Sequence, residues 1–168
     1  MSAFDRLKAE IDGQSARPPL RVLAASGQLG YGIPGAALKA GIAREPHVIG
    51  ADMGSIDPGP AYLGSGQIAT SPSMTARDLR LVLTAARKLD VPLLIGSAGT
   101  AGTNSQLNTV AEILRQVAAD EDLHFNLALI EADMPRDVVV EAVNGGRTQA
   151  IGAIAALDDE TVNGAANI

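Results

Sequence analysis

Residues 92–119, PLLIGSAGTAGTNSQLNTVAEILRQVAA, decide the fold class of this chain. A short apolar run, Pro92 to Ile95, ends in a glycine-rich loop, and from Ser105 to Ala119 apolar residues recur at spacings of three and four. The first pattern is typical of a buried strand, and the second is typical of an amphipathic helix. This segment is therefore predicted to run from a strand through a loop into a helix.

The same alternation extends to both sides. Further strands are predicted at Leu20 to Ala25, Val48 to Ala51 and Asn126 to Ile130, with a weaker one at Gln149 to Ala153. The helical patterns between them are Pro34 to Ala43, Ala76 to Leu89 with Thr75 or Ser73 as its cap, and Pro135 to Val143. Alternating strands and helices indicate right-handed βαβ units. We therefore expect an α/β fold with a mostly parallel sheet and helices on both faces, a Rossmann-like arrangement of three layers.

The chain ends suggest a division into an entry segment and one main domain. Residues 1–19 form a predicted helix, Met1 to Ile11, followed by a linker, and residues 20–168 form the α/β ligand-binding domain. A helix begins at Asp158 to Glu160, yet the sequence stops at Ile168 without a closing element. We expect the N-terminal part of a longer protein, and a frayed natural end is the alternative.

Composition excludes several classes of protein. The net charge of −6 and the thin spread of the 13 Lys and Arg residues leave no basic stripe for nucleic acid or an anionic membrane. There is no cysteine for a disulfide, a thiolate zinc site or a thiol nucleophile. The charged N-terminus lacks the apolar core of a signal peptide, and no apolar run reaches the length of a membrane span. A cytoplasmic location is expected.

In an open parallel sheet, ligands bind beyond the carboxyl ends of the strands. The loop after the first predicted strand holds Gly30, Gly32 and Gly35 at the GxGxxG spacing, with Asp52 in the place of an acid that would bind a ribose. These glycines begin late and Pro34 interrupts the turn, so an NAD(P)-binding domain is a weaker alternative to a plain glycine-rich loop or a different small ligand.

The loop after the second predicted strand is GADMGSIDPGPAYLGSG, from Gly50 to Gly66. Its glycines and prolines exclude a regular helix or strand across it. Asp52 and Asp57 fit acid and base roles, hydrogen bonds to a substrate, or oxygen ligation of a divalent metal such as Mg²⁺, although no spacing here is diagnostic of a metal. The alternative is that both carboxylates cap turns, and the two interpretations stay open.

Two further loops are expected at the same end of the sheet. Gly96 to Ser105 leads into a helix amino terminus and suits a carboxylate or phosphate, although the lysine of a Walker motif is missing. Thr103, Asn104 or Ser105 should cap that helix. Glu131 and Asp133 follow the fourth predicted strand, so these carboxylates are expected to converge with Asp52, Asp57 and the Ser97 loop.

His47 and His124 are predicted at the opposite end of the sheet, in structural positions. The serines of the loops therefore have no well-placed histidine, and no GxSxG elbow occurs. A Ser-His-Asp triad is not expected.

The stretches GADMGSIDPGPAYLGSG, PLLIGSAGTAG and LALIEADMP resemble, in this order and spacing, the N-terminal part of the acyclic terpene utilisation protein family, over about Gly50 to Gly146. Members of that family are usually longer than this chain. The resemblance implies a role in the catabolism of branched or terpenoid acids or their acyl-CoA esters, without supplying a mechanism. Met53 and Ile56 depart from the family pattern, which leaves the shape of the substrate open.

We therefore expect an enzyme of the lyase, hydratase or isomerase type that acts on a small carboxylate or thioester. Asp52 and Asp57 are the expected catalytic residues. The expected substrate-binding residues are Ser26, Gly27, Gly54, Ser55, Tyr62, Ser65, Gly96, Ser97, Ala98, Gly99, Thr100, Glu131 and Asp133. The alternative is a non-catalytic subunit that binds a small anionic metabolite, with a homo-oligomer or a partner chain supplying a C-terminal segment.

Overall fold

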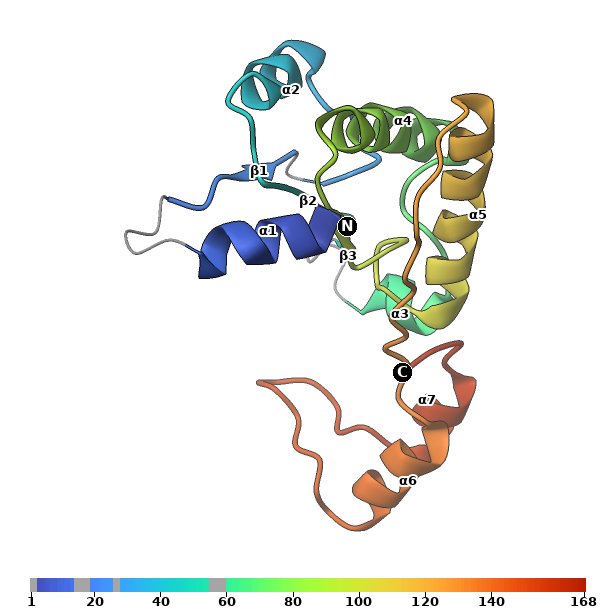
Figure 1. Ribbon diagram of the computed structural model, residues 1–168. Helices are drawn as coiled ribbons and strands as arrows, with labels where there is room; N and C mark the ends of the chain where they lie inside the picture. Colours follow the sequence, from blue (N-terminus) through green and yellow to red (C-terminus); the bar gives the residue numbers. More distant parts are fainter. Residues whose placement is uncertain (1–2, 14–18, 26–27, 55–59) are drawn as a thin grey trace.

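A computed structural model describes residues 3–13, 19–25, 28–54 and 60–168 of the chain. Its centre is a three-stranded parallel sheet of β1 (Val22–Ala24), β2 (Val48–Asp52) and β3 (Leu93–Gly96), in the order β1-β2-β3 (Figure 1). Asp52 pairs with Gly96 at the carboxyl end of β2 and β3. The α/β class and the parallel sheet are confirmed, and the loops after β2 and β3 leave the sheet at one edge.

The described helices are α1 (Ala3–Asp12), α2 (Gly35–Ile42), α3 (Ala61–Ser65), α4 (Pro72–Leu89), α5 (Asn104–Asp120), α6 (Arg136–Asn144) and α7 (Asp159–Gly164). Helix α4 begins at Pro72 rather than Ala76, because Ser71 Oγ accepts a hydrogen bond from the Met74 N–H at 3.3 Å. Thr103 caps α5 by accepting from the Gln106 N–H at 3.2 Å. The prediction that the loop after β2 contains no helix is wrong, since α3 forms within it.

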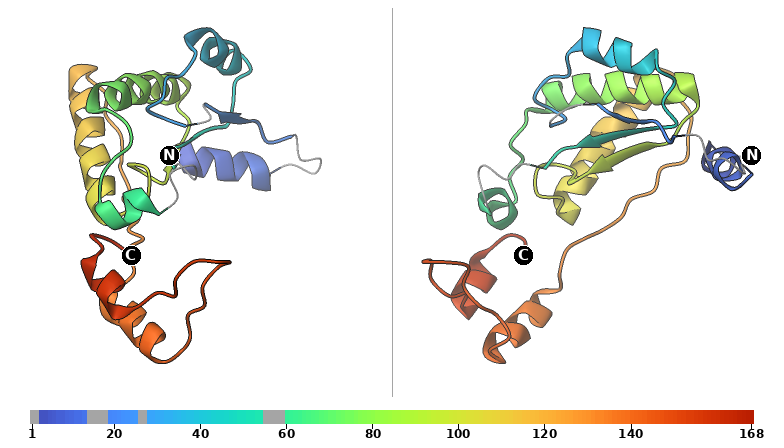
Figure 2. Two further views of the ribbon diagram at one scale, coloured as in Figure 1. Left: turned by 180° about the vertical axis from the view of Figure 1, so that it is seen from behind. Right: turned by 90° about the vertical axis from the view of Figure 1, so that its left-hand side faces the viewer.

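Helices α2 and α4 lie on the same side of the sheet (Figure 2). Leu79 and Val82 of α4 and Ile49 of β2 are fully buried in this layer. On the opposite face Val22 and Leu94 are 61% and 64% exposed, so the expected third layer does not cover them. The strand order β1-β2-β3 explains why one face is left uncovered. When each right-handed crossover adds the next strand on the same side of the previous one, the connecting helices all pack on one face of the sheet.

The predicted strands Asn126 to Ile130 and Gln149 to Ala153 are wrong. Both segments lie outside the sheet, and their side chains Ile130 and Ile151 are 83% and 88% exposed. A strand needs a neighbour for its backbone groups, and residues 126–130 instead run as a single extended segment from the end of α5 towards α6 (Figures 1 and 2). An apolar run alone did not specify a pairing partner.

The C-terminal helices pack on each other. Arg136 of α6 donates to the carbonyls of Val162 and Ala165, and Val162 is fully buried. Ala166 N–H donates to Gly64 O at 2.6 Å, which ties the end of the chain to α3. No helix in the described ranges has both the length and the apolar character needed to cross a membrane.

The carboxyl end of α4 provides a test of pH dependence. Arg87 Nη2 donates to Asp90 Oδ1 at 3.0 Å, and this hydrogen bond, supported by Arg6, lowers the pKa of Asp90 below its ordinary value. A lowered folded pKa adds stability that is present above the unfolded pKa of about 3.9 and is lost as the pH falls through the folded value. Urea unfolding should show wild type more stable than Asp90→Asn at pH 7, with the difference disappearing as the pH falls below about 4.

Asp122 provides the matched control, since it is also an aspartate at positive φ after a helix. It forms no ion pair with any residue that the structure describes. Asp122→Asn should leave the pH profile unchanged. A difference between wild type and Asp90→Asn that persists at pH 3 would contradict the ion-pair explanation.

Candidate functional site

The loops that follow β2 and β3 meet at the carboxyl edge of the sheet. Met53 N–H donates to Gly96 O at 2.9 Å, which continues the strand pairing beyond β2. A Cβ atom added to Gly54 would lie 2.9 Å from Ser97 Cβ, and one added to Gly96 would lie 3.5 Å from Asp52 Oδ1. Four predicted site residues, Asp52, Gly54, Gly96 and Ser97, are therefore neighbours, and glycine is needed at position 54 for this close approach.

Asp52 is exposed and forms a turn with its own backbone. Its Oδ1 atom accepts from the Gly54 N–H at 2.9 Å, which is the turn-capping contact that the sequence left as an alternative. In the described part of the chain Oδ2 has no hydrogen-bond partner. The carboxylate is thus fixed through Oδ1, and its second oxygen is left without a partner among the described residues.

The turn after β3 has an unusual backbone. Ser97, Gly99 and Thr100 have φ values of 47°, 82° and 96°, in the left-handed region that few non-glycine residues adopt. Within the described residues, the N–H groups of Ser97, Ala98 and Gly99 donate no hydrogen bond. Ala98 is only 7% exposed, and buried backbone donors are nearly always paired. Among the described residues, this turn therefore leaves three successive N–H groups without an acceptor, the kind of donor set that can bind an anion.

Other polar groups of this loop are used internally. Thr100 is buried, and its Oγ1 atom accepts from the Ala69 N–H at 3.0 Å. Gln106 is 1% exposed and joins three segments, because its Nε2 donates to Tyr62 O at 3.2 Å and Gln67 O at 2.7 Å, and its Oε1 accepts from the Ala101 N–H at 2.8 Å. Sequence reasoning missed Gln106, although its place three residues after Thr103 and four before Val110 puts it on the buried face of α5.

The remaining predicted residues are more scattered. Asp133 Oδ1 accepts from the Asn104 N–H at 2.9 Å, so this carboxylate occupies the amino terminus of α5. Ser65 Oγ accepts from the Gln67 N–H at 3.3 Å, Tyr62 is half-buried on α3, and Glu131 is exposed. Ser26, Gly27, Ser55 and Asp57 lie outside the described residues.

The described carboxylates of the predicted site do not form a metal centre. Where the structure describes the chain, it contains no group of three or more His, Asp or Glu side chains arranged to hold a metal ion. Asp52, Glu131 and Asp133 therefore do not form such a group. The structure gives Asp133 a capping position and leaves Asp52 beside the Ser97 turn.

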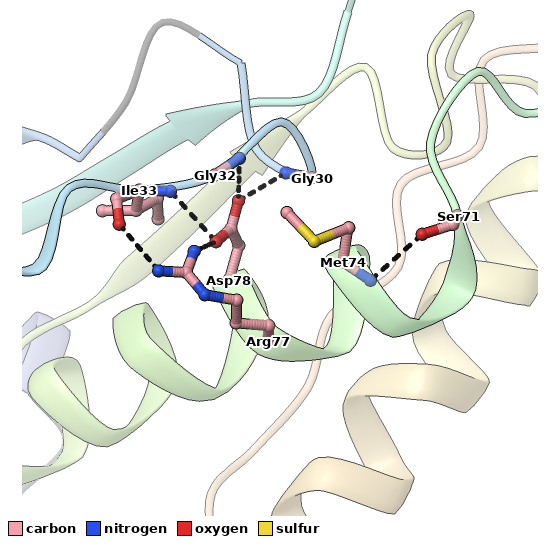
Figure 3. A network of polar contacts seen from close by, with 7 residues as sticks. All are labelled: Gly30, Gly32, Ile33, Ser71, Met74, Arg77 and Asp78. Carbon is pink, nitrogen blue, oxygen red and sulfur yellow. Dashed lines mark hydrogen bonds and ion pairs between the residues drawn. The ribbon is translucent and has the colours of Figure 1, made fainter.

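The glycine-rich loop after β1 holds a buried carboxylate of the chain itself (Figure 3). Asp78 of α4 is fully buried, and its two oxygens accept from the N–H groups of Gly30 at 2.9 Å, Gly32 at 2.9 Å and Ile33 at 3.1 Å. Arg77 Nη1 donates to Asp78 Oδ1 at 2.6 Å, and Arg77 Nη2 donates to Ile33 O at 3.2 Å. The backbone donors that a dinucleotide phosphate would need are thus already bound to Asp78.

Asp78 was missed because it lies in the middle of a helical pattern, where a single aspartate is usually solvated. The available signal was its place in the apolar stripe, since Thr75, Leu79 and Val82 are all buried neighbours on α4. A carboxylate on a buried face requires donors, and the loop with Gly30 and Gly32 supplies them.

Comparisons with protein-family models, with curated protein sequences and with solved structures find no match to this chain. The resemblance to the acyclic terpene utilisation family therefore stays a prediction from the three sequence motifs.

Proposed function

We propose that the protein binds a small carboxylate, or the thioester of one, at the Ser97 turn, and that it converts this ligand as a lyase, hydratase or isomerase. The resemblance to the acyclic terpene utilisation family supports branched or terpenoid acids as the substrate class. The observation that carries the proposal is the set of N–H groups at Ser97, Ala98 and Gly99, which have no acceptor among the described residues and lie beside the exposed carboxylate of Asp52.

The chemistry follows from this pairing. Backbone donors that are fixed before the reaction stabilise the negative charge of a carboxylate or of a developing enolate. A carboxylate within reach of the adjacent carbon accepts its proton or returns one to it. In this proposal the turn of Ser97 to Gly99 binds the anionic oxygen, and Oδ2 of Asp52, which does not contact Gly54, is the base.

A second candidate is a non-catalytic subunit that binds the same class of metabolite. The Asx contact between Asp52 and Gly54 favours it, because this contact gives the carboxylate a structural role. The loops Gly50 to Gly66 and Gly96 to Ser105 also contain no His, Cys or Lys, which removes the commonest acid, base and nucleophile types.

Thermal unfolding with millimolar branched carboxylic acids and their CoA thioesters tests both candidates, since a ligand that binds the native state raises its stability. At a concentration 100 times Kd, the expected stabilisation is about 2.7 kcal/mol. Asp52→Asn retains an oxygen for the Gly54 N–H, so it should preserve the ligand-induced shift and abolish turnover. Glu112→Gln, at an exposed position on α5, is the matched control and should change neither.

The outcomes separate the two functions. A shift in wild type and in Asp52→Asn, with turnover in wild type alone, supports the enzyme. A shift in both without any turnover supports the binding subunit. The absence of a shift with every acid and thioester contradicts both.

A further inference from the structure

We infer that Asp78 is a positioning residue for the candidate site: its buried carboxylate fixes residues 28–33, here called the β1 loop, and through this loop it sets the backbone of Asp52 and Met53. The inference rests on the proposed function, because that proposal assigns the site that Asp78 would position. The contacts and the test below involve no ligand of the Ser97 turn.

Asp78 fixes the β1 loop through hydrogen bonds to its backbone. Its side chain is fully buried, and it accepts from three N–H groups within four consecutive residues, Gly30, Gly32 and Ile33. Gly30 and Gly32 have φ values of 99° and 109°, which let the backbone turn its N–H groups towards one point. The loop is therefore shaped around a carboxylate, and helix α4 supplies it.

The β1 loop in turn contacts the backbone of the candidate site. Leu29 N–H donates to Asp52 O at 2.7 Å, and Gln28 Nε2 donates to Met53 O at 3.1 Å. Leu29 and Met53 are 0% and 1% exposed, so both contacts lie against packed side chains. The backbone that carries the Asp52 side chain is thus held by β3 on one side, through Met53 N–H and Gly96 O, and by the β1 loop on the other.

The contacts at position 78 fit a carboxylate better than its amide. Each oxygen of an ionised carboxylate accepts more than one hydrogen bond, whereas an asparagine amide has one oxygen and one NH₂ donor. An asparagine at this position would direct an NH₂ group at the N–H of Gly30 and Gly32 or at that of Ile33. The side-chain shape would be retained, and some of the hydrogen bonds from the β1 loop to position 78 would be lost.

Hydrogen exchange of individual amides in Asp78→Asn tests the positioning role. We expect the Leu29 and Met53 amides to exchange at least tenfold faster than in wild type relative to Val82 of α4, because the β1 loop opens locally while the helix stays packed. Asp120→Asn, at an exposed carboxylate that pairs with Arg80, should leave this ratio unchanged. A purely structural role of Asp78 would accelerate all three amides by the same factor, and this result would overturn the inference.

A second measurement does not depend on the exchange experiment and asks whether an added carboxylate replaces the one that is removed. In Asp78→Ala the three N–H groups would face a space about the size of the carboxylate that was removed. Sodium formate at 100 mM should raise the Tm of Asp78→Ala above its value in sodium chloride at equal ionic strength, and it should leave wild type and Asp120→Ala unchanged. Equal Tm values of Asp78→Ala in formate and chloride would contradict a loop built around a carboxylate. A failure of the acid and thioester screen would leave both of these results untouched, so the two proposals fail separately.

Discussion

Asp78→Ala should lower the free energy of unfolding by about 3–5 kcal/mol, the largest loss expected from one side chain in this fold. The substitution removes a fully buried carboxylate and leaves the N–H groups of Gly30, Gly32 and Ile33 without an acceptor. A buried donor without a partner costs about 1–3 kcal/mol, and the loop regains part of this by relaxing towards water. A domain of ordinary stability has about 5–15 kcal/mol in total, so the variant should retain a weakened fold.

Urea unfolding followed by circular dichroism measures this loss, and Arg77→Ala is the matched control. Arg77 touches the same carboxylate, but its side chain is 48% exposed and Asp78 keeps its three backbone donors when Arg77 is removed. The expected loss for Arg77→Ala is about 1 kcal/mol. Equal losses for the two variants would mean that the ion pair, rather than the loop contacts, stabilises the fold.

The contrast between Asp78 and Asp52 shows how far sequence reasoning reached in the candidate site. The loops after β2 and β3 were expected at one edge of the sheet, and Gly54 and Ser97 are neighbours there because parallel strands end together. The turn contact of Asp52 was foreseen as an alternative. The partner of the glycine-rich loop was not foreseen, because a contact over 48 residues in sequence has no local signal.

The difference between local and long-range signals also explains which parts of the fold were predicted correctly. Helices α4 and α5 were predictable because their apolar spacing is a local feature, and Thr103 was among the expected caps of α5. The cap of α4 is Ser71 and not the predicted Thr75 or Ser73, so the first turn of this helix was missed. The segment of residues 126–130 carries an equally clear apolar run, but a strand also needs a neighbour that its own sequence does not specify. The third layer is not confirmed for a related reason, since the side of the sheet on which a helix packs depends on the order of the strands.

Gly99→Ala should disrupt the Ser97 turn with the second-largest effect, a loss of about 2–5 kcal/mol in the free energy of unfolding. Two causes add. Gly99 has a φ of 82°, where a side chain strains the backbone, and an added Cβ would lie 2.5 Å from Gln106 Cβ and 3.1 Å from Gln106 Cα. Gln106 has no room to withdraw, because its amide bridges Tyr62, Gln67 and Ala101 in a buried position.

Gly146→Ala separates these two causes. Gly146 has a φ of 66°, but an added Cβ would meet nothing within 4 Å, so this variant carries the backbone strain alone and should lose about 1–2 kcal/mol. Thermal or urea unfolding measures the loss of stability in each variant, and the difference between the two losses is the cost of the steric clash with Gln106. Equal losses would show that Gln106 moves aside at little cost. A larger loss for Gly99→Ala, together with a weaker Tm shift by any acid that binds wild type, would tie the packing of Gly99 on Gln106 to the geometry of the N–H groups of Ser97 to Gly99.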